Sequence, residues 1–233
     1  MSDVLKQLIE RNIILQGAGE TLYMTFVSSL FAYILGIPLG VILAVTDENG
    51  VKPIKWLNTI LGFIVNVFRS IPFLILMLAM LPVAKFFVGT SLGNEAMVVM
   101  LVIAAAPYVA RMVESSLKEI DKGVVEASRS MGANTFQIIF KVLLPEAKPA
   151  LIVGAVISTV TVLGYSAMAG TIGAGGLGKI AISYGHQKYK DDVIWVCVAL
   201  TVIIVQIVQF VGMSIAKKTD KRITGKGKKN KTN

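Results

Sequence analysis

The chain contains 233 residues, of which 55% are hydrophobic and 16% are charged, and its net charge is +9. Soluble domains average about a quarter charged residues, and here the apolar residues occur in long runs rather than at amphipathic spacing. Length, composition and charge therefore exclude a soluble protein and indicate an integral membrane protein.

The N-terminal 19 residues predict a short amphipathic helix ahead of the first long apolar run. Charged residues interrupt the apolar ones at helical spacing: Asp3, Lys6, Glu10 and Arg11 stand between Val4, Leu5, Leu8, Ile9, Ile13 and Ile14. A helix with this pattern lies in the interface between membrane and water. We expect it on the membrane surface rather than across the membrane.

Five apolar runs are candidate membrane spans, taking roughly 20 apolar residues as the length required. They are Leu22–Val45, Trp56–Val83, Ala96–Ala110, Ala150–Ala169 and Val193–Ala216. The third run is the shortest, and the second is interrupted by Arg69 and Pro72. The predicted fold class is an all-α integral membrane protein with about five transmembrane helices.

Arg69 makes membrane insertion of the second run less favourable, because an arginine inside a span raises the free energy of insertion by roughly 3 kcal/mol. Pro72 lacks a backbone donor and is expected to kink the helix. Two interpretations stay open. In one, Arg69 lies near the cytoplasmic interface and the span starts close to Ile71. In the other, Arg69 is buried or faces a pore, which makes it a candidate pathway residue.

The C-terminal segment 217–233 is strongly basic, with eight Lys or Arg residues against one Asp. Positive residues mark the cytoplasmic side of a membrane protein. The segment has no aromatic residues, so attraction to anionic lipid headgroups explains it better than binding to nucleic acid. We therefore expect a basic cytoplasmic tail, 217–233, after a transmembrane domain, 1–216.

The cytoplasmic tail sets the orientation of the remaining segments. With an odd number of spans the N-terminus, and with it the amphipathic helix, lies outside. The connecting segment 114–148 then lies inside and the segment 170–192 outside. This topology places the most polar connection of the chain in the cytoplasm.

Residues 126–145, EASRSMGANTFQIIFKVLLP, form a short polar segment of helical pattern in that cytoplasmic connection, between two apolar spans. They match the pattern E-A-A-x3-G-x9-I-x-L-P at Glu126, Ala127, Gly132, Leu144 and Pro145. Ser128 replaces the second Ala and Val142 replaces the Ile, and both changes conserve size. The pattern resembles the cytoplasmic docking loop of ABC-importer permeases.

The resemblance implies a coupling loop of about residues 114–148. In that family the loop forms a short helix pair in a cleft of a separate ATPase subunit and turns ATP-driven closure into movement of the pore. The implied ATPase-coupling residues are Glu126, Ala127, Ser128, Gly132, Val142, Leu144 and Pro145. We expect Gly132 in a turn with positive φ or close packing. We expect Glu126 to cap or pair at the first helix, with a solvated role as the alternative.

Further short strings narrow the resemblance to the methionine-importer branch of the ABC permeases. They are residues 67–73 (VFRSIPF), 88–93 (VGTSLG), 105–114 (AAPYVARMVE) and 164–168 (GYSAM) followed by 173–178. With the docking loop, they cover the chain from about Leu22 to Phe210. The alternatives left open are a permease for another amino acid or a small peptide, and a secondary transporter.

The resemblance also implies the partners. They are a second copy of the permease in a homodimer, two copies of a cytoplasmic ABC ATPase, and an extracytoplasmic methionine-binding lipoprotein delivering D- or L-methionine. The expected location is the bacterial inner membrane, and the expected architecture is that of a type I ABC importer permease.

The fourth span carries small and hydroxyl residues ending in Gly164-Tyr165-Ser166-Ala167-Met168, with no charge. Such residues ordinarily pack helix against helix in membranes. The alternative hypothesis places Tyr165, Ser166 and Met168 near the dimer axis, where they line or close the pathway. Met168 would then act as a flexible apolar plug.

The glycine-rich segment 173–180, GAGGLGKI, satisfies G-x-G-x-x-G. A phosphate loop needs a preceding β-strand and a final Ser or Thr, whereas this segment follows a membrane span and ends in Ile180. We therefore expect a structural role, in which glycines permit irregular backbone and close helix contacts.

The chain offers no groups for catalysis or metal binding. Cys197 is the only cysteine and lies in a span, and His186 is the only histidine and is expected to be a solvated residue of an outer segment. No internal disulfide, Cys/His metal site or Ser/His/Asp triad can be assembled from them. We expect no cofactor, and ATP hydrolysis by a partner rather than by this chain.

Overall fold

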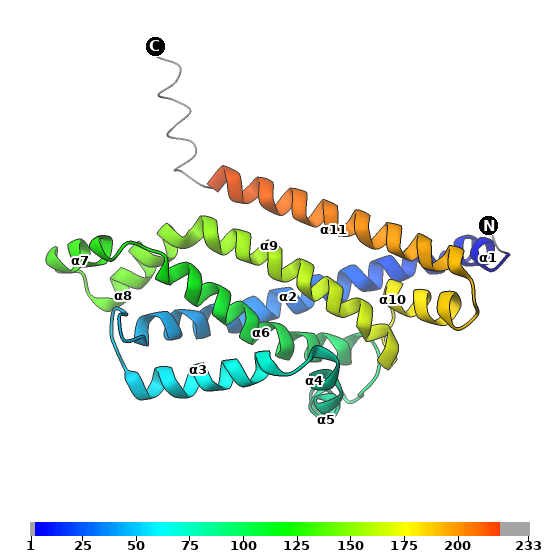
Figure 1. Ribbon diagram of the computed structural model, residues 1–233, viewed down its shortest axis with the longest axis horizontal. Helices are drawn as coiled ribbons and strands as arrows, with labels where there is room; N and C mark the ends of the chain where they lie inside the picture. Colours follow the sequence, from blue (N-terminus) through cyan, green and yellow to red (C-terminus); the bar gives the residue numbers. More distant parts are fainter. Residues whose placement is uncertain (1–2, 220–233) are drawn as a thin grey trace, which may run out of the picture. The chain divides into compact units, whose positions relative to one another are not determined.

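The computed structural model describes residues 3–219, and no strand occurs among them (Figure 1). Helices satisfy their own backbone hydrogen bonds, which a lipid environment requires. The all-α prediction is confirmed. Residues 220–233, most of the predicted basic tail, lie outside the described residues. The α-helices are α1 Asp3–Glu10, α2 Ile13–Thr46, α3 Lys55–Ser70, α4 Phe73–Ala79, α5 Leu81–Val88, α6 Asn94–Lys118, α7 Lys122–Ser130, α8 Thr135–Ile138, α9 Leu144–Ala169, α10 Gly176–Ile180 and α11 Asp191–Thr219.

Shorter helical turns of other types join some of these helices. The π-helical segments are η1 Ile139–Leu143 and η3 Ala181–His186, and a 3-10 turn, η2, covers Gly170–Ile172. The predicted outer connection 170–192 is therefore largely helical rather than a loop. The glycines of this segment suggested irregular backbone, but only Gly173 and Gly175 occupy the break between η2 and α10, and the others lie within helical turns.

Four helical segments are long and apolar enough to cross a membrane: α2, α6, the stretch Thr135–Ile172 that contains α9, and α11. Each contains one predicted run and extends beyond it at both ends. Four of the five predicted spans are thus confirmed as helices. The count reaches five if the bent pair α3 and α4 forms one span.

The second predicted span, Trp56–Val83, is not one continuous helix. α3 ends at Ser70, and Pro72 stands before α4 with an extended ψ of 135°. Proline has no N–H to continue the helix and disfavours helical backbone in the residue before it. The expected break at Pro72 is confirmed. α3 begins at Lys55 and Arg69 lies in its last turn, so Arg69 stands at the end of a helix, and its depth in the membrane stays a prediction.

The chain forms two compact units, each built from segments far apart in the sequence. The first unit contains the segments up to Ala32, Ser70–Ala106 and Ser158–Val208. The second unit contains Tyr33–Arg69, Pro107–Ile157 and the segment from Gln209. The helices α2, α6, α9 and α11 each contribute a part to both units.

In the first unit, α1 packs its apolar side on protein. Figure 1 shows α1 beside α10 and the start of α11. Leu5 and Leu8 are buried in one cluster with Leu177, Val193 and Cys197. The predicted amphipathic helix is confirmed for residues 3–10, but its apolar face is covered by these helices, and Ile13 and Ile14 belong to α2. Its position relative to the membrane stays a prediction.

In the second unit, α2 and α6 lie in close contact. A Cβ atom added to Gly40 would lie 2.6 Å from Cβ of Val113, closer than real side chains approach. Small residues at such crossings let two membrane helices pack backbone to backbone. This contact brings the C-terminal ends of α2 and α6 together, and the segments that follow them form the candidate site.

Candidate functional site

The predicted docking loop folds as a short helix pair, α7 and α8. Asp121 caps α7 by accepting from the backbone N–H of Gly123 at 2.6 Å. Asn134 and Gln137 form a reciprocal capping box at the start of α8, with both hydrogen bonds at 2.9 Å. Side chains of this kind satisfy the free N–H groups of a first helical turn. Two separate caps explain why the segment forms two helices rather than one.

Gly132 connects the two helices in a left-handed conformation, with φ of 82°. Its N–H donates to the carbonyl of Arg129 at 2.8 Å, and that of Ala133 donates to the carbonyl of Ser128 at 3.1 Å. A Cβ atom at Gly132 would meet no neighbour within 4 Å in the part of the chain that the structure describes. The predicted positive φ is confirmed, and glycine is needed here for the backbone angle rather than for space.

The other motif residues divide into packed and exposed ones. Ser128 is buried, and its hydroxyl donates to the carbonyl of Val124 at 2.8 Å. Glu126 is exposed in the middle of α7, so the prediction that it caps this helix is wrong, because Asp121 is the cap. Ala127 and Pro145 are also exposed, and Val142 and Leu144 are half-buried.

The junction between α8 and α9 explains the proline of the motif. Residues 139–143 are π-helical, and the N–H of Leu144 donates to the carbonyl of Ile139. The α-helical pattern resumes at Leu144. Pro145 has no N–H to donate, and it stands in the first turn after one hydrogen-bond pattern gives way to the other. The interval 114–148 is thus helical at both ends, since it begins in α6 and ends in α9.

Three apolar side chains on or directly after α7 and α8 are more than half exposed, and sequence reasoning missed them. Met131 is 81% exposed, Phe136 68% and Phe140 53%. The rings of Phe136 and Phe140 pack on each other with centroids 4.4 Å apart. An exposed apolar patch on a polar segment marks a protein contact. Two Phe residues four apart, directly after the polar cap Asn134, were the signal available in the sequence.

A loop of the second unit holds α7 in place. Residues 47–54 connect α2 to α3, and with α7 they line a cavity of about 290 Å³ that Glu126 also borders. The Arg129 guanidinium donates to the carbonyl of Val51, and Lys122 Nζ donates to Asn49 Oδ1 at 3.4 Å. The helix α7 is therefore attached to the rest of the second unit through this loop as well as through its own ends.

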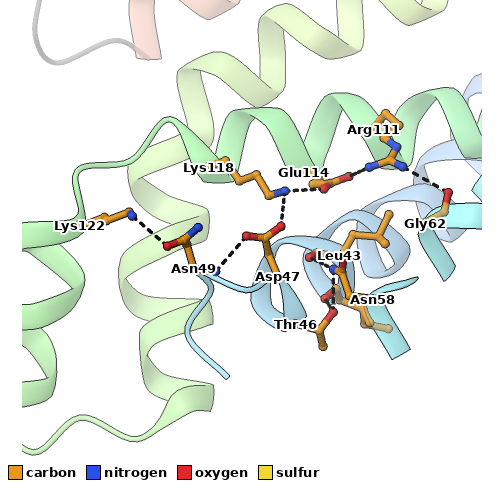
Figure 2. Close-up of polar contacts among 11 residues, drawn as sticks. Leu43, Thr46, Asp47, Asn49, Asn58, Gly62, Arg111, Glu114, Lys118 and Lys122 are labelled. Atoms are coloured by element: carbon orange, nitrogen blue, oxygen red, sulfur yellow. Dashed lines mark hydrogen bonds and ion pairs between the residues drawn. The ribbon is translucent and has the colours of Figure 1, made fainter. Parts of the chain in front are cut away.

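A row of charged residues lies next to that loop (Figure 2). Glu114 binds Arg111 at 2.6 Å and Lys118 at 2.8 Å, and Lys118 also binds Asp47 at 2.7 Å. Arg111, Glu114 and Lys118 occupy one side of α6 at helical spacing, a pattern visible in the sequence. The contact with Asp47, 71 residues away, was not visible there.

The Asp47–Lys118 pair has a predictable response to acid. The hydrogen bond from Lys118, followed by that from the Asn49 N–H, lowers the pKa of Asp47 below its ordinary value. A carboxyl whose pKa is lower in the folded than in the unfolded protein stabilises the folded state. This stabilisation is complete above the unfolded-state pKa, about 3.9, and is lost as the pH falls through the folded-state pKa. We expect Asp47→Asn to destabilise the protein between pH 8 and 5, and this difference to shrink only below about pH 4. Thermal unfolding of both proteins across this range measures it, with Glu48→Gln as the control.

The pathway candidates of α9 face different surroundings in the first unit. The Tyr165 ring stacks on Phe73 with centroids 4.3 Å apart. Ser166 is buried, and its hydroxyl donates to the carbonyl of Leu163 at 2.7 Å. Met168 is 48% exposed. In the second unit, Arg69 is exposed at the end of α3. The hydroxyl of Ser166 is thus engaged within its own helix, and Met168 and Arg69 are the exposed candidates.

The glycine-rich segment is held by side chains of α2 and α6. Asn94 accepts from Gly175 N–H at 2.8 Å, Glu20 from Gly176 N–H at 2.7 Å, and Thr21 from Leu177 N–H at 2.9 Å. These are the donors that a phosphate would need, so the predicted structural role is confirmed. The sequence did not indicate the contact that Glu20 makes with this segment. His186, at the end of η3, is exposed as expected.

Comparison with known sequences identifies the chain's family. Residues 36–225 match the family described as the inner membrane component of binding-protein-dependent transport systems. The chain is 46% identical over 214 residues to the probable D-methionine transport system permease protein MetI of Vibrio cholerae, covering 92% of this chain and 95% of that protein. It is 48% identical over 203 residues to the methionine import system permease protein MetP of Bacillus subtilis, covering 87% and 91%.

Solved structures agree with the sequence comparison. The MetNI methionine ABC transporter, solved in inward-facing conformations, contains a chain with a TM-score of 0.89 and 45% identity, covering 95% of this chain and 100% of that one. An amino acid ABC transporter solved with histidines shares the fold alone, with a TM-score of 0.77 at 19% identity. The coupling helix pair, the apolar helices and these matches lead to one conclusion: the chain belongs to the family of inner-membrane permease components of ABC importers.

Proposed function

We propose that this protein is the membrane-spanning permease of an ATP-driven importer whose substrate is methionine. The observation that carries the proposal is its likeness to the MetNI transporter, at 45% identity and a TM-score of 0.89 over 95% of the chain. Similar permeases from Vibrio cholerae and Bacillus subtilis bear methionine-transport names. The coupling helix pair, with its left-handed Gly132, supplies the feature that an ATPase partner requires.

The working transporter then contains two copies of this chain, two copies of a cytoplasmic ABC ATPase and an extracytoplasmic methionine-binding protein, in a bacterial inner membrane. We assign ATP hydrolysis to the ATPase. Within residues 3–219, no group of three or more His, Cys, Asp or Glu side chains could hold a metal ion. The chain's task is mechanical: it provides the pathway and the surface that the ATPase moves.

The motif residues have separate tasks in this mechanism. ATP draws the two ATPase subunits together, and they carry the coupling helices α7 and α8 with them. The exposed apolar side chains of these helices contact the ATPase, while Ser128 and Leu143, both buried, attach them to the permease. Movement of α7 shifts the equilibrium between inward-open and outward-open states, and hydrolysis allows the return.

Reconstitution tests the proposed function directly. The permease, its ATPase and its binding protein are placed in proteoliposomes with ATP enclosed and radiolabelled methionine outside. We expect uptake of methionine that requires both ATP and the binding protein and continues after ionophores collapse all ion gradients. Uptake driven by an ion gradient without the ATPase would identify a secondary transporter instead, and competition by unlabelled amino acids would reveal a different substrate.

Within this function we propose that Met168 and Tyr165 close the translocation pathway near the axis of the dimer. The exposure of Met168 and the stacking of Tyr165 on Phe73 support this. The stacked ring of Tyr165 has a fixed position from which it can orient the flexible side chain of Met168. Arg69 stays a candidate at the end of α3. We expect Met168→Ala to raise ATP hydrolysis in the absence of substrate by roughly fivefold, because the closed state loses its plug.

Two measurements decide the role of Met168. A single cysteine at position 168, in a chain lacking Cys197, should crosslink two permease copies in at least one nucleotide state. Ala167→Gly, at the adjacent half-buried position, serves as the control and should leave basal hydrolysis unchanged. Absence of a crosslink in every nucleotide state, with normal transport by Met168→Ala, would assign α9 to helix packing alone.

A further inference from the structure

Glu114 is a buried carboxylate at the centre of a chain of polar contacts in the second unit (Figure 2). Its side chain is 6% exposed, and both oxygens are engaged: Oε2 accepts from Arg111 Nη1 at 2.6 Å and Oε1 from Lys118 Nζ at 2.8 Å. Well-packed apolar residues often replace a buried ion pair without loss of stability. The C-terminal end of α6 could therefore be stable without these charges. The ion pairs of Glu114 point to a role in fixing the positions of the segments that they connect.

The contacts of Glu114 continue toward α3 and toward the loop 47–54. Arg111 Nη2 donates to Asn66 Oδ1 at 2.8 Å and to the carbonyl of Gly62 at 3.2 Å, both on α3. In the other direction, Lys118 Nζ donates to Asp47 Oδ2 at 2.7 Å. One carboxylate thus fixes two cations that each reach a different neighbouring segment. Charge-assisted hydrogen bonds of this length hold their geometry more strongly than neutral ones.

The loop 47–54 completes the connection to the coupling helix. Asp47 Oδ1 accepts from the N–H of Asn49 at 3.1 Å, and Asn49 Oδ1 in turn accepts from Lys122 of α7. Arg129, also on α7, donates to the carbonyl of Val51. A continuous series of hydrogen bonds therefore runs from α7 through the loop and α6 to α3.

We propose that Glu114 is a positioning residue of the importer, which joins α3, α6 and the loop that holds α7 into one rigid body. Movement imposed on α7 by the ATPase then reaches the membrane helices instead of being absorbed by the loop. The inference rests on the proposed function, because it concerns how ATP-driven movement enters the permease. Without the carboxylate charge, Arg111 and Lys118 lose their common partner, and the loop can move independently of α6 and α3.

The test compares Glu114→Gln with the unaltered permease in the full reconstituted transporter. Gln keeps the shape of Glu but lacks its charge. The measured quantity is the number of methionine molecules imported per ATP hydrolysed, which a loss of stability alone would not change. We expect this ratio to fall roughly tenfold while ATPase subunits remain bound and hydrolyse ATP. Glu119→Gln, an exposed carboxylate just beyond α6, is the matched control and should keep the normal ratio.

Asp47→Asn provides a second variant that leaves the buried Glu114 pairs intact. It breaks the connection to the loop at a side chain that is 25% exposed, so a smaller fall in the ratio, roughly threefold, is expected. Because both variants act through Lys118, their effects should be less than additive in the double variant. If Glu114→Gln fails to assemble, the result for Asp47→Asn decides the matter.

Each outcome has one meaning. A lowered ratio in Glu114→Gln, or in Asp47→Asn where Glu114→Gln does not assemble, supports the positioning role. An unchanged ratio in an assembled Glu114→Gln transporter overturns it, as does an unchanged ratio in Asp47→Asn when the other variant cannot be assembled. The unaltered transporter separates these results from the proposed function: if it imports no methionine with ATP, the function itself is wrong.

Discussion

Replacing Phe136 with Ala is expected to weaken binding of the ATPase to the permease by roughly 30-fold or more. Truncating an aromatic anchor at the centre of an interface costs at least about 2 kcal/mol. Phe136 is 68% exposed on the coupling helices and is supported from one side by Phe140. The permease loses no internal core contact of comparable size, so it should still insert and fold. Titration of the ATPase onto detergent-solubilised permease measures the effect.

Phe86→Ala is the matched control for this prediction. Phe86 is 84% exposed on α5, outside the coupling segment, and its removal should leave ATPase affinity unchanged. Phe140→Ala should have an intermediate effect, because it withdraws the support of Phe136 as well as its own contact. Equal ATPase affinity for the Phe136 variant and the unaltered permease would show that the patch has another partner.

The second large effect is expected from Gly132→Val, which should leave the permease inserted but reduce both ATPase association and transport. At φ of 82°, a β-branched residue is strained by roughly 2 kcal/mol. This strain is relieved if the turn reopens and α8 rotates away from α7. The two helices would then no longer present Met131 and Phe136 together. Co-purification of the ATPase and ATP-dependent uptake measure the two consequences.

Gly132→Asn distinguishes backbone strain from crowding at the same position. Asn adopts positive φ more readily than other residues with a side chain, and a Cβ atom at this site meets no neighbour within 4 Å among residues 3–219. We expect this variant to retain most ATPase binding. Equal loss in the Asn and Val variants would mean that the ATPase itself packs against the glycine, whereas full activity of the Val variant would refute a coupling role for the turn.

The segment that contains α7 and α8 shows how far local sequence features can specify a structure. The two caps, Asp121 and Asn134, and the glycine between the helices act over a few residues, so the helix pair and the positive φ at Gly132 could be predicted. The role of Glu126 could not. Its identity as a motif residue suggested a cap, but the hydrogen bond that begins α7 is made five residues earlier, by Asp121.

The second span shows a different limit. Its composition suggested one helix from Trp56 to Val83, and Pro72 was correctly expected to interrupt it. A hydropathy pattern reports only how apolar a segment is, not its direction after a break. Three helices, α3, α4 and α5, take the place of one, and the apolar character of all three concealed the second break at Met80.

By itself, the sequence determined the class of the protein, four of its long helices and the helix pair α7 and α8. These follow from properties local to the chain: the length of an apolar run, a capping side chain, a glycine. Only the tertiary structure decided which polar groups meet. Asp47 and Lys118 are 71 residues apart, and Glu20 and Gly176 are 156 residues apart. No local pattern specifies such pairs, because they form only when packing of the helices brings distant carboxylates, cations and backbone donors within hydrogen-bonding distance.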